Sequence, residues 1–400
     1  MDTTIYLSQA SFLMSHNAAT GYLPTLSPKK PITQALATYA KNQVGSVYQQ
    51  LNHGARALDL RPKLLMNGTI IFHHGNFVEI PISYERLLQD VVRWCTENPE
   101  ELVLLLPSNL QYEYSAYNDD GSAYVSAMQS VYDQFGITYK HCNDIYDYTV
   151  ADAMEIASLD SGGYVLALDQ QDYYGSFCGK SNWIEDLLVT CYSYPTLDDY
   201  GEVQKQISGV RCTESKKNQL QPIQSLKEYV LASANNEATD NNQQLGPPSD
   251  TYNFPFNEIQ ALWQVDNQVV ASGMSHFSSL LEDNRRSKVN ADVVRWIYDG
   301  ELDQQSSGIS LLAVDNVALH GNALLSVLRT RCSQTDDVIC GTDLDMPKLF
   351  YVPTTKILYW SVCTALFVFT IVKIWFLWSR HKQKIQADIE LVYNSYMLSA

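Results

Sequence analysis

Short continuous apolar runs recur along the chain and are the feature that most restricts its fold. Runs of this length suit strands that are buried on both faces, as in a parallel sheet. Strands are predicted on this basis at residues 11–15, 55–60, 69–72, 102–106, 164–168, 229–232, 261–265 and 309–314. Amphipathic helices are predicted between several of them, at residues 84–95, 123–135, 150–159, 291–298 and 322–328.

The alternation of strands and helices predicts an α/β fold with a parallel sheet. Eight strands within residues 1–335 fit a TIM-like (β/α)8 barrel with insertions. A doubly wound sheet is the alternative, because the later strands follow the pattern less clearly than the first four.

The net charge limits the partners that such a fold can have. The 400 residues are 46% hydrophobic and carry a formal net charge of −17, so a sizeable core can be buried. Nucleic acid is not expected as a partner, because phosphate binding calls for a basic surface. The net charge also argues against broad electrostatic adhesion to an anionic membrane, so contact with a lipid needs another means of attachment.

An apolar stretch near the C-terminus, from Ile357 to Trp378, supplies such a means. It carries one charge, and at about 1.5 Å per residue it spans roughly 33 Å, which matches the hydrocarbon core of a bilayer. Aromatic side chains at both ends suit the level of the lipid headgroups. We therefore expect a single transmembrane helix at residues 357–378, after a barrel domain at 1–335 and a juxtamembrane linker at 336–356. A buried core helix is the alternative.

The flanks of this stretch bear on its orientation. The tail at residues 379–400 opens with basic residues, which predicts a cytoplasmic tail and a barrel that is extracellular or lumenal. Eight cysteines and the sequon Asn67-Gly68-Thr69 are compatible with this topology and with a glycoprotein. The N-terminal residues do not read as a signal peptide. The alternative is that the C-terminal span itself directs insertion and leaves the barrel in the cytosol.

Polar clusters follow the first three predicted strands. They are Ser15-His16-Asn17, Asp59-Leu60-Arg61 and His73-His74-Gly75. A lone histidine after a strand is more often structural than catalytic. Because the carboxyl ends of parallel barrel strands meet on one face, three successive clusters are expected to share one pocket.

The residue types in these clusters suit the cleavage of a phosphodiester without a metal. Two histidines can act as general base and general acid on opposite sides of a reacting centre. An arginine held by a carboxylate stabilises negative charge that develops on a phosphoryl oxygen. Zinc or another transition metal is the competing explanation for clustered His and Asp, but a guanidinium among the ligands would repel the cation.

Four segments extend this interpretation to a family. FLMSHNAATG, VYQQLNHGARALDLRP, TIIFHHGN and ENPEELVLLLP occur in an order and spacing that resemble the X-domain of phosphatidylinositol-specific phospholipases C. Residues 10–110 carry the resemblance, and residues 150–330 fit it in outline. The resemblance implies a TIM-like phosphodiesterase barrel whose partner is an inositol phospholipid or a related phosphodiester.

The family has a calcium-dependent and a metal-independent variant. The position of the second acidic calcium ligand on the second strand is Arg61 here, and Pro107, Ser108 and Asn109 follow the fourth strand without a carboxylate. Hard oxygen ligands that calcium needs are therefore missing, although Asn17 matches the calcium-dependent pattern. We expect the metal-independent, bacterial-type variant with no cofactor, calcium being the less favoured choice.

The resemblance also implies roles for individual residues. His16 would be the general base on the inositol 2-hydroxyl, and Arg61, oriented by Asp59, would stabilise the charge at phosphorus. His74 would be the general acid for the diacylglycerol oxygen, because the histidine next to Gly75 matches the motif better than its neighbour does.

Three further residues are predicted to bind substrate. Asn17 follows the proposed base, Asp169 follows the fifth predicted strand, and Asp315 follows the last one.

Two other functions compete with this interpretation. A glycerophosphodiester phosphodiesterase shares the barrel, but it would show an AHRG-like start and Glu-x-Asp ligands where this chain has SHNA and DLR. A non-catalytic ectodomain that binds a lipid headgroup or a protein is the other alternative, although such a domain has no need to retain His16, Arg61 and His74.

Overall fold

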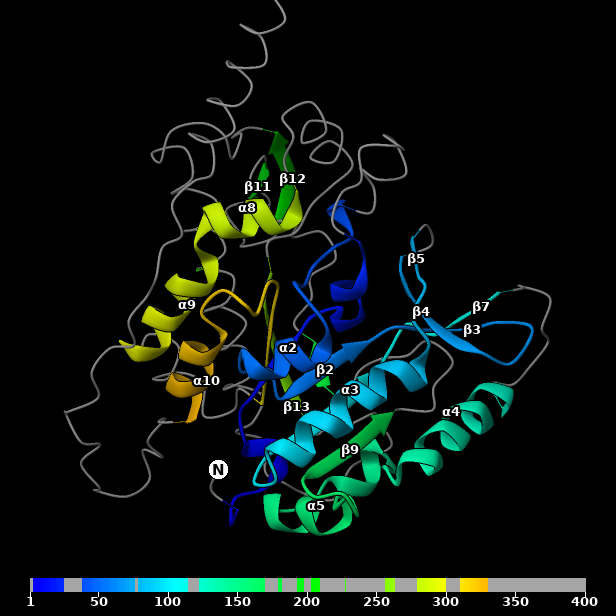
Figure 1. Ribbon diagram of the computed structural model, residues 1–400. Coiled ribbons are helices and arrows are strands. Elements are labelled where there is room, and N and C mark those ends of the chain that lie inside the picture. The colour runs from blue at the N-terminus through cyan, green and yellow to red at the C-terminus, as the bar shows by residue number, and fades with distance from the viewer. Residues whose placement is uncertain are drawn as a thin grey trace, which may run out of the picture. The chain divides into compact units, whose positions relative to one another are not determined.

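A computed structural model (Figure 1) describes residues 3–24, 38–75, 78–113, 122–169, 179–181, 193–197, 203–208, 227, 256–262, 279–299 and 310–329. The chain divides into two compact units, Met1–Leu349 and Phe350–Ala400, and every described residue belongs to the first. No helix within the described residues is long and apolar enough to cross a membrane. The predicted linker, transmembrane helix and tail lie outside the described residues.

The main sheet has eight strands, and every neighbouring pair is parallel. Its order is β10-β13-β14-β1-β2-β6-β9-β8. The strands are β1 (Phe12–Ser15), β2 (Ala57–Leu60), β6 (Leu102–Pro107), β8 (Thr138–His141), β9 (Tyr164–Asp169), β10 (Gly179–Ser181), β13 (Phe256–Ala261) and β14 (Leu311–Val314). The predicted α/β class with a parallel sheet is confirmed. Closure into a barrel stays a prediction, because no pairing between β8 and β10 is present among the described residues.

Most of the predicted strands coincide with observed ones, and the exceptions have physical causes. The strand predicted at 261–265 shares only Ala261 with β13, which runs from Phe256 to Ala261, and residues 263–265 lie outside the described part of the chain. The earlier part of β13 was missed because Glu258 and Gln260 interrupt its apolar pattern. Strand β8 was not predicted, because it lies at the edge of the sheet and is only half buried. The strand predicted at 229–232 lies outside the described residues.

The strand predicted at 69–72 exists, but its assignment to the parallel sheet is wrong. It is β4 (Ile70–His74), and it pairs antiparallel with β3 (Pro62–Leu64) and β5 (Val78–Ile80). Together with β7 (Gln111–Tyr112) these strands form a separate four-stranded sheet of order β5-β4-β3-β7 (Figure 1). A parallel crossover needs a dozen or more residues, and the chain between β2 and β4 is too short for one. A third, two-stranded sheet pairs β11 (Ser193–Leu197) with β12 (Val203–Ser208).

The helices cover the main sheet, and the predicted ones are confirmed as α3, α4, α5, α9 and α10. Helix α3 packs against α2 and α4, and α9 packs against α10 (Figure 1). The α-helices are α2 (Val47–Asn52), α3 (Tyr84–Glu97), α4 (Ser122–Phe135), α5 (Val150–Ile156), α8 (Leu280–Ser287), α9 (Val289–Tyr298) and α10 (Gly321–Arg329). Three 3-10 helices are η1 (Leu7–Gln9), η2 (Ala18–Tyr22) and η3 (Cys142–Ile145).

Alternate residues of the main strands enter two different cores, as the two-residue period of a strand requires. One set packs with α3, α9 and α10, for example Leu13 and Leu58. The other set forms a second cluster, which we call the inner core. Its strand members include Phe12, Met14, Ala57, Leu102, Leu104, Leu106, Leu166, Leu168, Leu311 and Ala313.

An ion-pair cluster ties α10 to the amino ends of two main strands. Glu101 accepts hydrogen bonds from Arg56 Nε at 2.9 Å and from Arg329 Nη1 at 2.9 Å. The Arg56 guanidinium also lies over the ring of Trp94, 4.5 Å from its centroid. Burial would raise the pKa of Glu101, but hydrogen bonds from both guanidiniums outweigh it and lower that pKa to about 2. The carboxylate therefore stays ionised and holds the last described helix to the sheet.

Candidate active site

The inner core ends in polar side chains at the carboxyl edge of the main sheet. In β1, Met14 belongs to the inner core, and His16 takes the next position on the same face. In β2 the same two-residue step leads from Ala57 to Asp59, and then to Arg61 just after the strand. In β14 it leads from Ala313 to Asp315, which follows the strand. Since β1 lies between β2 and β14, the three strand ends bring these residues together.

His16 is held by the carboxylate of Asp315, and both side chains are buried. Nδ1 of His16 lies 2.8 Å from Oδ1 of Asp315. An ionised carboxylate can only accept, so Nδ1 carries the hydrogen, and Nε2 of the neutral ring keeps a lone pair. Nε2 faces Arg61 Nη2 and Asn17 Nδ2, each at 3.0 Å. A buried imidazole in this tautomer can accept a proton at Nε2.

Asp59 holds the arginine beside this nitrogen. Its Oδ2 accepts from the Asn17 backbone N–H at 2.8 Å and from Arg61 Nη2 at 3.3 Å, and its Oδ1 accepts from the Ser108 hydroxyl at 3.2 Å. Burial opposes ionisation, but the charge of Arg61 and the hydrogen bond from the Asn17 N–H together lower the pKa of Asp59 below its ordinary value. The ionised carboxylate thus fixes a guanidinium where negative charge on a phosphoryl oxygen could be stabilised.

His74 reaches the same site from the four-stranded sheet. Its Nδ1 donates to the carbonyl oxygen of Ala40 at 2.9 Å. Burial lowers the pKa of His74 to about 3, and the positive charge of Arg61 acts in the same direction. The ring is therefore neutral in the free site at pH 7. The Nδ1 contact leaves Nε2 as the nitrogen that can meet a substrate.

His73 has a different environment. Both of its ring nitrogens lie against backbone carbonyls, Nδ1 at 3.0 Å from Gly75 O and Nε2 at 2.7 Å from Asn109 O. Burial lowers its pKa, although the two carbonyl contacts oppose this effect. Its ring links β4 to the turn after β6, which favours a structural role and leaves His74 as the candidate acid.

These side chains do not suit a calcium ion. Calcium takes six to eight oxygen ligands, whereas the guanidinium of Arg61 lies 3.3 Å from the buried carboxylate of Asp59. No group of three or more His, Cys, Asp or Glu side chains that could hold a metal occurs in the part of the chain that the structure describes.

Comparisons with known proteins bear on the same residues. The family model PI-PLC X 1 matches residues 35–132. The chain contains a PI-PLC X region. Over 103 residues it is 35% identical to a PI-PLC X-box domain-containing protein of Dictyostelium discoideum, an overlap that covers 24% of this chain and 14% of that protein's length.

Two solved structures are similar to the chain at low identity. The phosphatidylinositol-specific phospholipase C of Staphylococcus aureus gives 15% identity and a TM-score of 0.46, covering 79% of this chain and 89% of that one. The enzyme of the same name from Listeria monocytogenes gives 14% identity and a TM-score of 0.45, covering 82% of this chain and 95% of that one. Similarity at this level carries no residue roles over to this chain.

The PI-PLC X region supplies only part of the candidate site. Asp59, Arg61 and His74 lie inside residues 35–132, whereas His16 and Asp315 lie outside them. The pairing of β1 with both β2 and β14 brings the outside residues to the region. The site is therefore assembled by the fold and not by one local motif.

The structure brings most of the predicted site residues together but does not support every predicted role. His16, Asn17, Asp59, Arg61 and Asp315 lie together, but Asp315 contacts the proposed base and is not placed as a separate substrate ligand. Their catalytic roles stay predictions.

Asp169 is the last residue of β9, at the same edge of the sheet. Its side chain lies outside the described residues, so its predicted contact with substrate also stays a prediction.

Three polar residues of the site were not predicted. Asn42 Nδ2 donates to Asp315 Oδ1 at 2.9 Å, and Gln43 Nε2 donates to the backbone oxygens of His16 and Val314, each at 2.9 Å. Asn42 and Gln43 precede α2 in an irregular segment without periodicity, so no sequence signal marks them. Ser108 follows β6 directly, and a single serine hydroxyl after a strand gives no sequence signal of a site.

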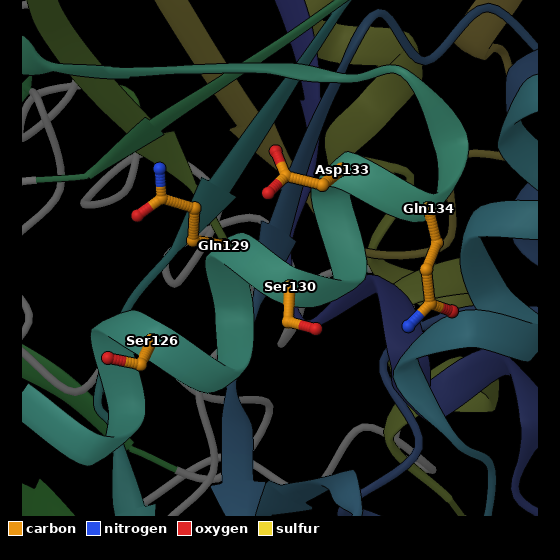
Figure 2. A pocket seen from close by; sticks show the side chains of 5 residues that line it. All are labelled: Ser126, Gln129, Ser130, Asp133 and Gln134. Carbon is orange, nitrogen blue, oxygen red and sulfur yellow. The ribbon is translucent and has the colours of Figure 1, made fainter.

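A separate hollow of about 570 Å³ lies along α4 and contains none of these residues. Figure 2 shows its described lining, which comes from this one helix: Ser126, Gln129, Ser130, Asp133 and Gln134. A single carboxylate among neutral side chains offers no acid and base pair, so the site at the sheet edge is the better candidate for chemistry.

Proposed function

We propose that the chain is a metal-independent phosphodiesterase of the phosphatidylinositol-specific phospholipase C type, acting on an inositol phospholipid or an inositol-glycan anchor. The observation that carries the proposal is the contact of Asp315 with Nδ1 of His16 while Nε2 faces Arg61. A base, a fixed guanidinium and a second, half-buried histidine are then close enough to interact electrostatically. The match of residues 35–132 to the PI-PLC X family supports the choice of substrate class.

The proposed first step is attack by the inositol 2-hydroxyl on phosphorus. Nε2 of His16 takes the hydroxyl proton while Nδ1 keeps its hydrogen on Asp315, so the imidazolium that forms lies against a carboxylate. Arg61 stabilises the negative charge on the phosphoryl oxygens. As the new P–O bond forms, the bond to the diacylglycerol oxygen breaks, and His74 gives that oxygen its proton.

The product of this step is a cyclic inositol phosphate. Water can open the ring through the same pair used in reverse, with His74 as base and His16 as acid. A neutral His74 must first gain a proton. The negative charge of a bound phosphodiester opposes the effect of Arg61 and favours the charged ring.

The test uses the purified full chain in detergent, with mixed micelles of phosphatidylinositol and, separately, an inositol-glycan-anchored protein. We expect release of diacylglycerol or of the anchored protein that is insensitive to a chelator and is lost in His16→Ala and His74→Ala. His53→Ala is the matched control, because His53 is exposed at the end of α2.

Other outcomes would favour the rival functions. Activity that requires calcium would contradict the metal-independent assignment. Cleavage of glycerophosphodiesters without cleavage of phosphatidylinositol would favour a glycerophosphodiester phosphodiesterase. Binding of an inositol headgroup without turnover would favour a non-catalytic barrel, an alternative supported by the fact that, within the described residues, the hydrogen bond of His74 goes to a backbone carbonyl and not to a carboxylate.

We also propose a single-pass membrane protein, anchored by residues 357–378, with the catalytic unit extracellular or lumenal and glycosylated. Cys142 is in a disulfide bond whose second cysteine lies outside the described residues, which suits an oxidising compartment. Asn67 and Gly68 of the Asn67-Gly68-Thr69 sequon are exposed at the turn between β3 and β4. A mobility shift on glycosidase treatment, absent in Asn67→Gln, supports this topology, and an unmodified chain labelled only from the cytosol contradicts it.

A further inference from the structure

We infer that residues 40–43 are a positioning segment that holds both histidines of the acid–base pair, with Asn42 as its principal positioning residue. The inference rests on the proposed function for its kinetic part. The segment precedes α2 and belongs to no helix or strand, yet its polar groups reach each half of the site. None of its residues was expected to contact the reacting groups.

On the side of the base, Asn42 fixes the carboxylate that fixes His16. Asn42 is buried, and its Nδ2 donates to Asp315 Oδ1 at 2.9 Å. The same oxygen accepts from His16 Nδ1, and the Asn42 amide nitrogen lies 3.3 Å from that ring nitrogen. Two donors on one carboxylate oxygen leave Asp315 little freedom to rotate. Asn42 therefore selects the orientation in which His16 exposes Nε2.

On the side of the acid, a backbone carbonyl of the same segment holds His74 in the way that Asp315 holds His16. The carbonyl oxygen of Ala40 accepts from His74 Nδ1 at 2.9 Å. His16 is thus supported by a carboxylate and His74 by a neutral carbonyl. Ala40 and Asn42 are two residues apart in one segment, so their contacts fix the two rings relative to each other.

The segment is itself anchored to the strands that carry the base. Gln43 is fully buried, and its amide joins β1 and β14 through the oxygens of His16 and Val314. The hydroxyl oxygen of Thr20 accepts from the backbone N–H groups of Asn42 and Gln43 at 3.1 and 3.2 Å. Because the segment is fixed by several hydrogen bonds, its contacts can fix the positions of both histidine rings.

The first experiment compares Asn42→Leu and Asn42→Asp with the wild-type chain. Both variants keep the side-chain size, but neither donates a hydrogen bond to Asp315. We expect kcat to fall roughly 10- to 100-fold with KM within about twofold, less than the loss of an acid or base itself. Asn322→Asp is the control, since it adds the same charge at an exposed position of α10.

The second experiment is independent of activity. Nitrogen-15 NMR of the histidine rings reports which nitrogen carries the hydrogen, and we expect the Nδ1–H form of His16 to lose population in both variants. Asn42→Ser keeps a donor and should recover part of this population and of kcat. Unchanged His16 resonances in folded variants would overturn the inference. If the wild-type chain cleaves no lipid, the proposed function fails while the NMR comparison still decides the role of Asn42.

Discussion

At the scale of single residues, His16 and His74 differ in what holds them. Asp315 lies against one ring and the Ala40 carbonyl against the other. A carboxylate favours a ring that gains a proton, whereas a carbonyl in a buried, positively charged setting does not. The two rings are therefore suited to opposite tasks, and each can be tested separately.

Replacing Asp315 tests His16, the ring proposed as the base. In Asp315→Asn the acceptor for Nδ1–H becomes an amide that no longer fixes the tautomer, so we expect kcat on phosphatidylinositol to fall by about 100-fold or more. Asp133→Asn on the exposed face of α4 removes the same charge away from the site and should leave kcat unchanged. Equal rates in the two variants would show that Asp315 does not orient the base.

Proton uptake on binding tests His74, the ring proposed as the acid. Because burial and nearby positive charge lower the pKa of His74 to about 3, its ring is neutral in the free site at pH 6 and Nε2 carries no proton. An anionic diester raises this pKa, and we expect binding of glycerophosphoinositol to take up a proton. Calorimetry at pH 6 in buffers of different ionisation enthalpy measures the uptake. His74→Gln should abolish it, and equal uptake in the variant would assign the proton to another group.

At the scale of secondary-structure elements, the Glu101 cluster joins α10 to the sheet. Its carboxylate contacts arginines from two distant parts of the chain. Because the pKa of Glu101 is lowered to about 2 when folded, its contribution to stability is present above the ordinary value near 4.5 and is lost as the pH falls towards 2.

Glu101→Gln measures this contribution. We expect the free energy of unfolding at pH 7 to fall by about 1–3 kcal/mol. The difference from the wild-type chain should shrink as the pH falls through the window from 4.5 to 2. Urea unfolding followed by tryptophan fluorescence gives the values, with the exposed neighbour Glu100→Gln as control. A loss that is the same at pH 7 and pH 3 would contradict an electrostatic origin.

The elements also explain how much of the site the sequence could predict. The polar residues at the ends of β1, β2 and β14 could be predicted, because continuous apolar runs indicate parallel strands. Alternate residues of a strand lie on the same face, so the face of each terminal residue follows from the strand before it. The strand that carries His74 was assigned to the wrong sheet, because an apolar run does not show which strand it pairs with. Asn42 and Gln43 could not be predicted, because an irregular segment has no period and its contacts depend on tertiary packing.

At the scale of the whole molecule, the two ends of the described unit meet at the site. Residues 12–15 of β1 pair in parallel with residues 311–314 of β14, and hydrogen bonds from Gln43 join the same two strands beyond their ends. Neither strand is at an edge of the main sheet. Opening this pair would break the sheet and separate His16 from Asp315 in one event.

Native-state hydrogen exchange tests this coupling. We expect the amides of Leu13 and Leu312 to share one opening free energy, close to that of global unfolding. Glu101→Gln should lower both by the same amount. If the β14 amides exchange well before those of β1, the last strand opens alone and the site can be disassembled while the rest stays folded.

The pairing of β1 with β14 also determines the point in protein synthesis at which His16 can first contact Asp315. His16 and Asp315 are separated by 299 residues in the chain, and a ribosome adds about 5–20 residues per second. Roughly 15–60 s of translation therefore separate the synthesis of the base from that of its carboxylate. Throughout that interval the nascent chain lacks a complete dyad, and the proposed cleavage of a phosphodiester cannot begin until Asp315 has been added.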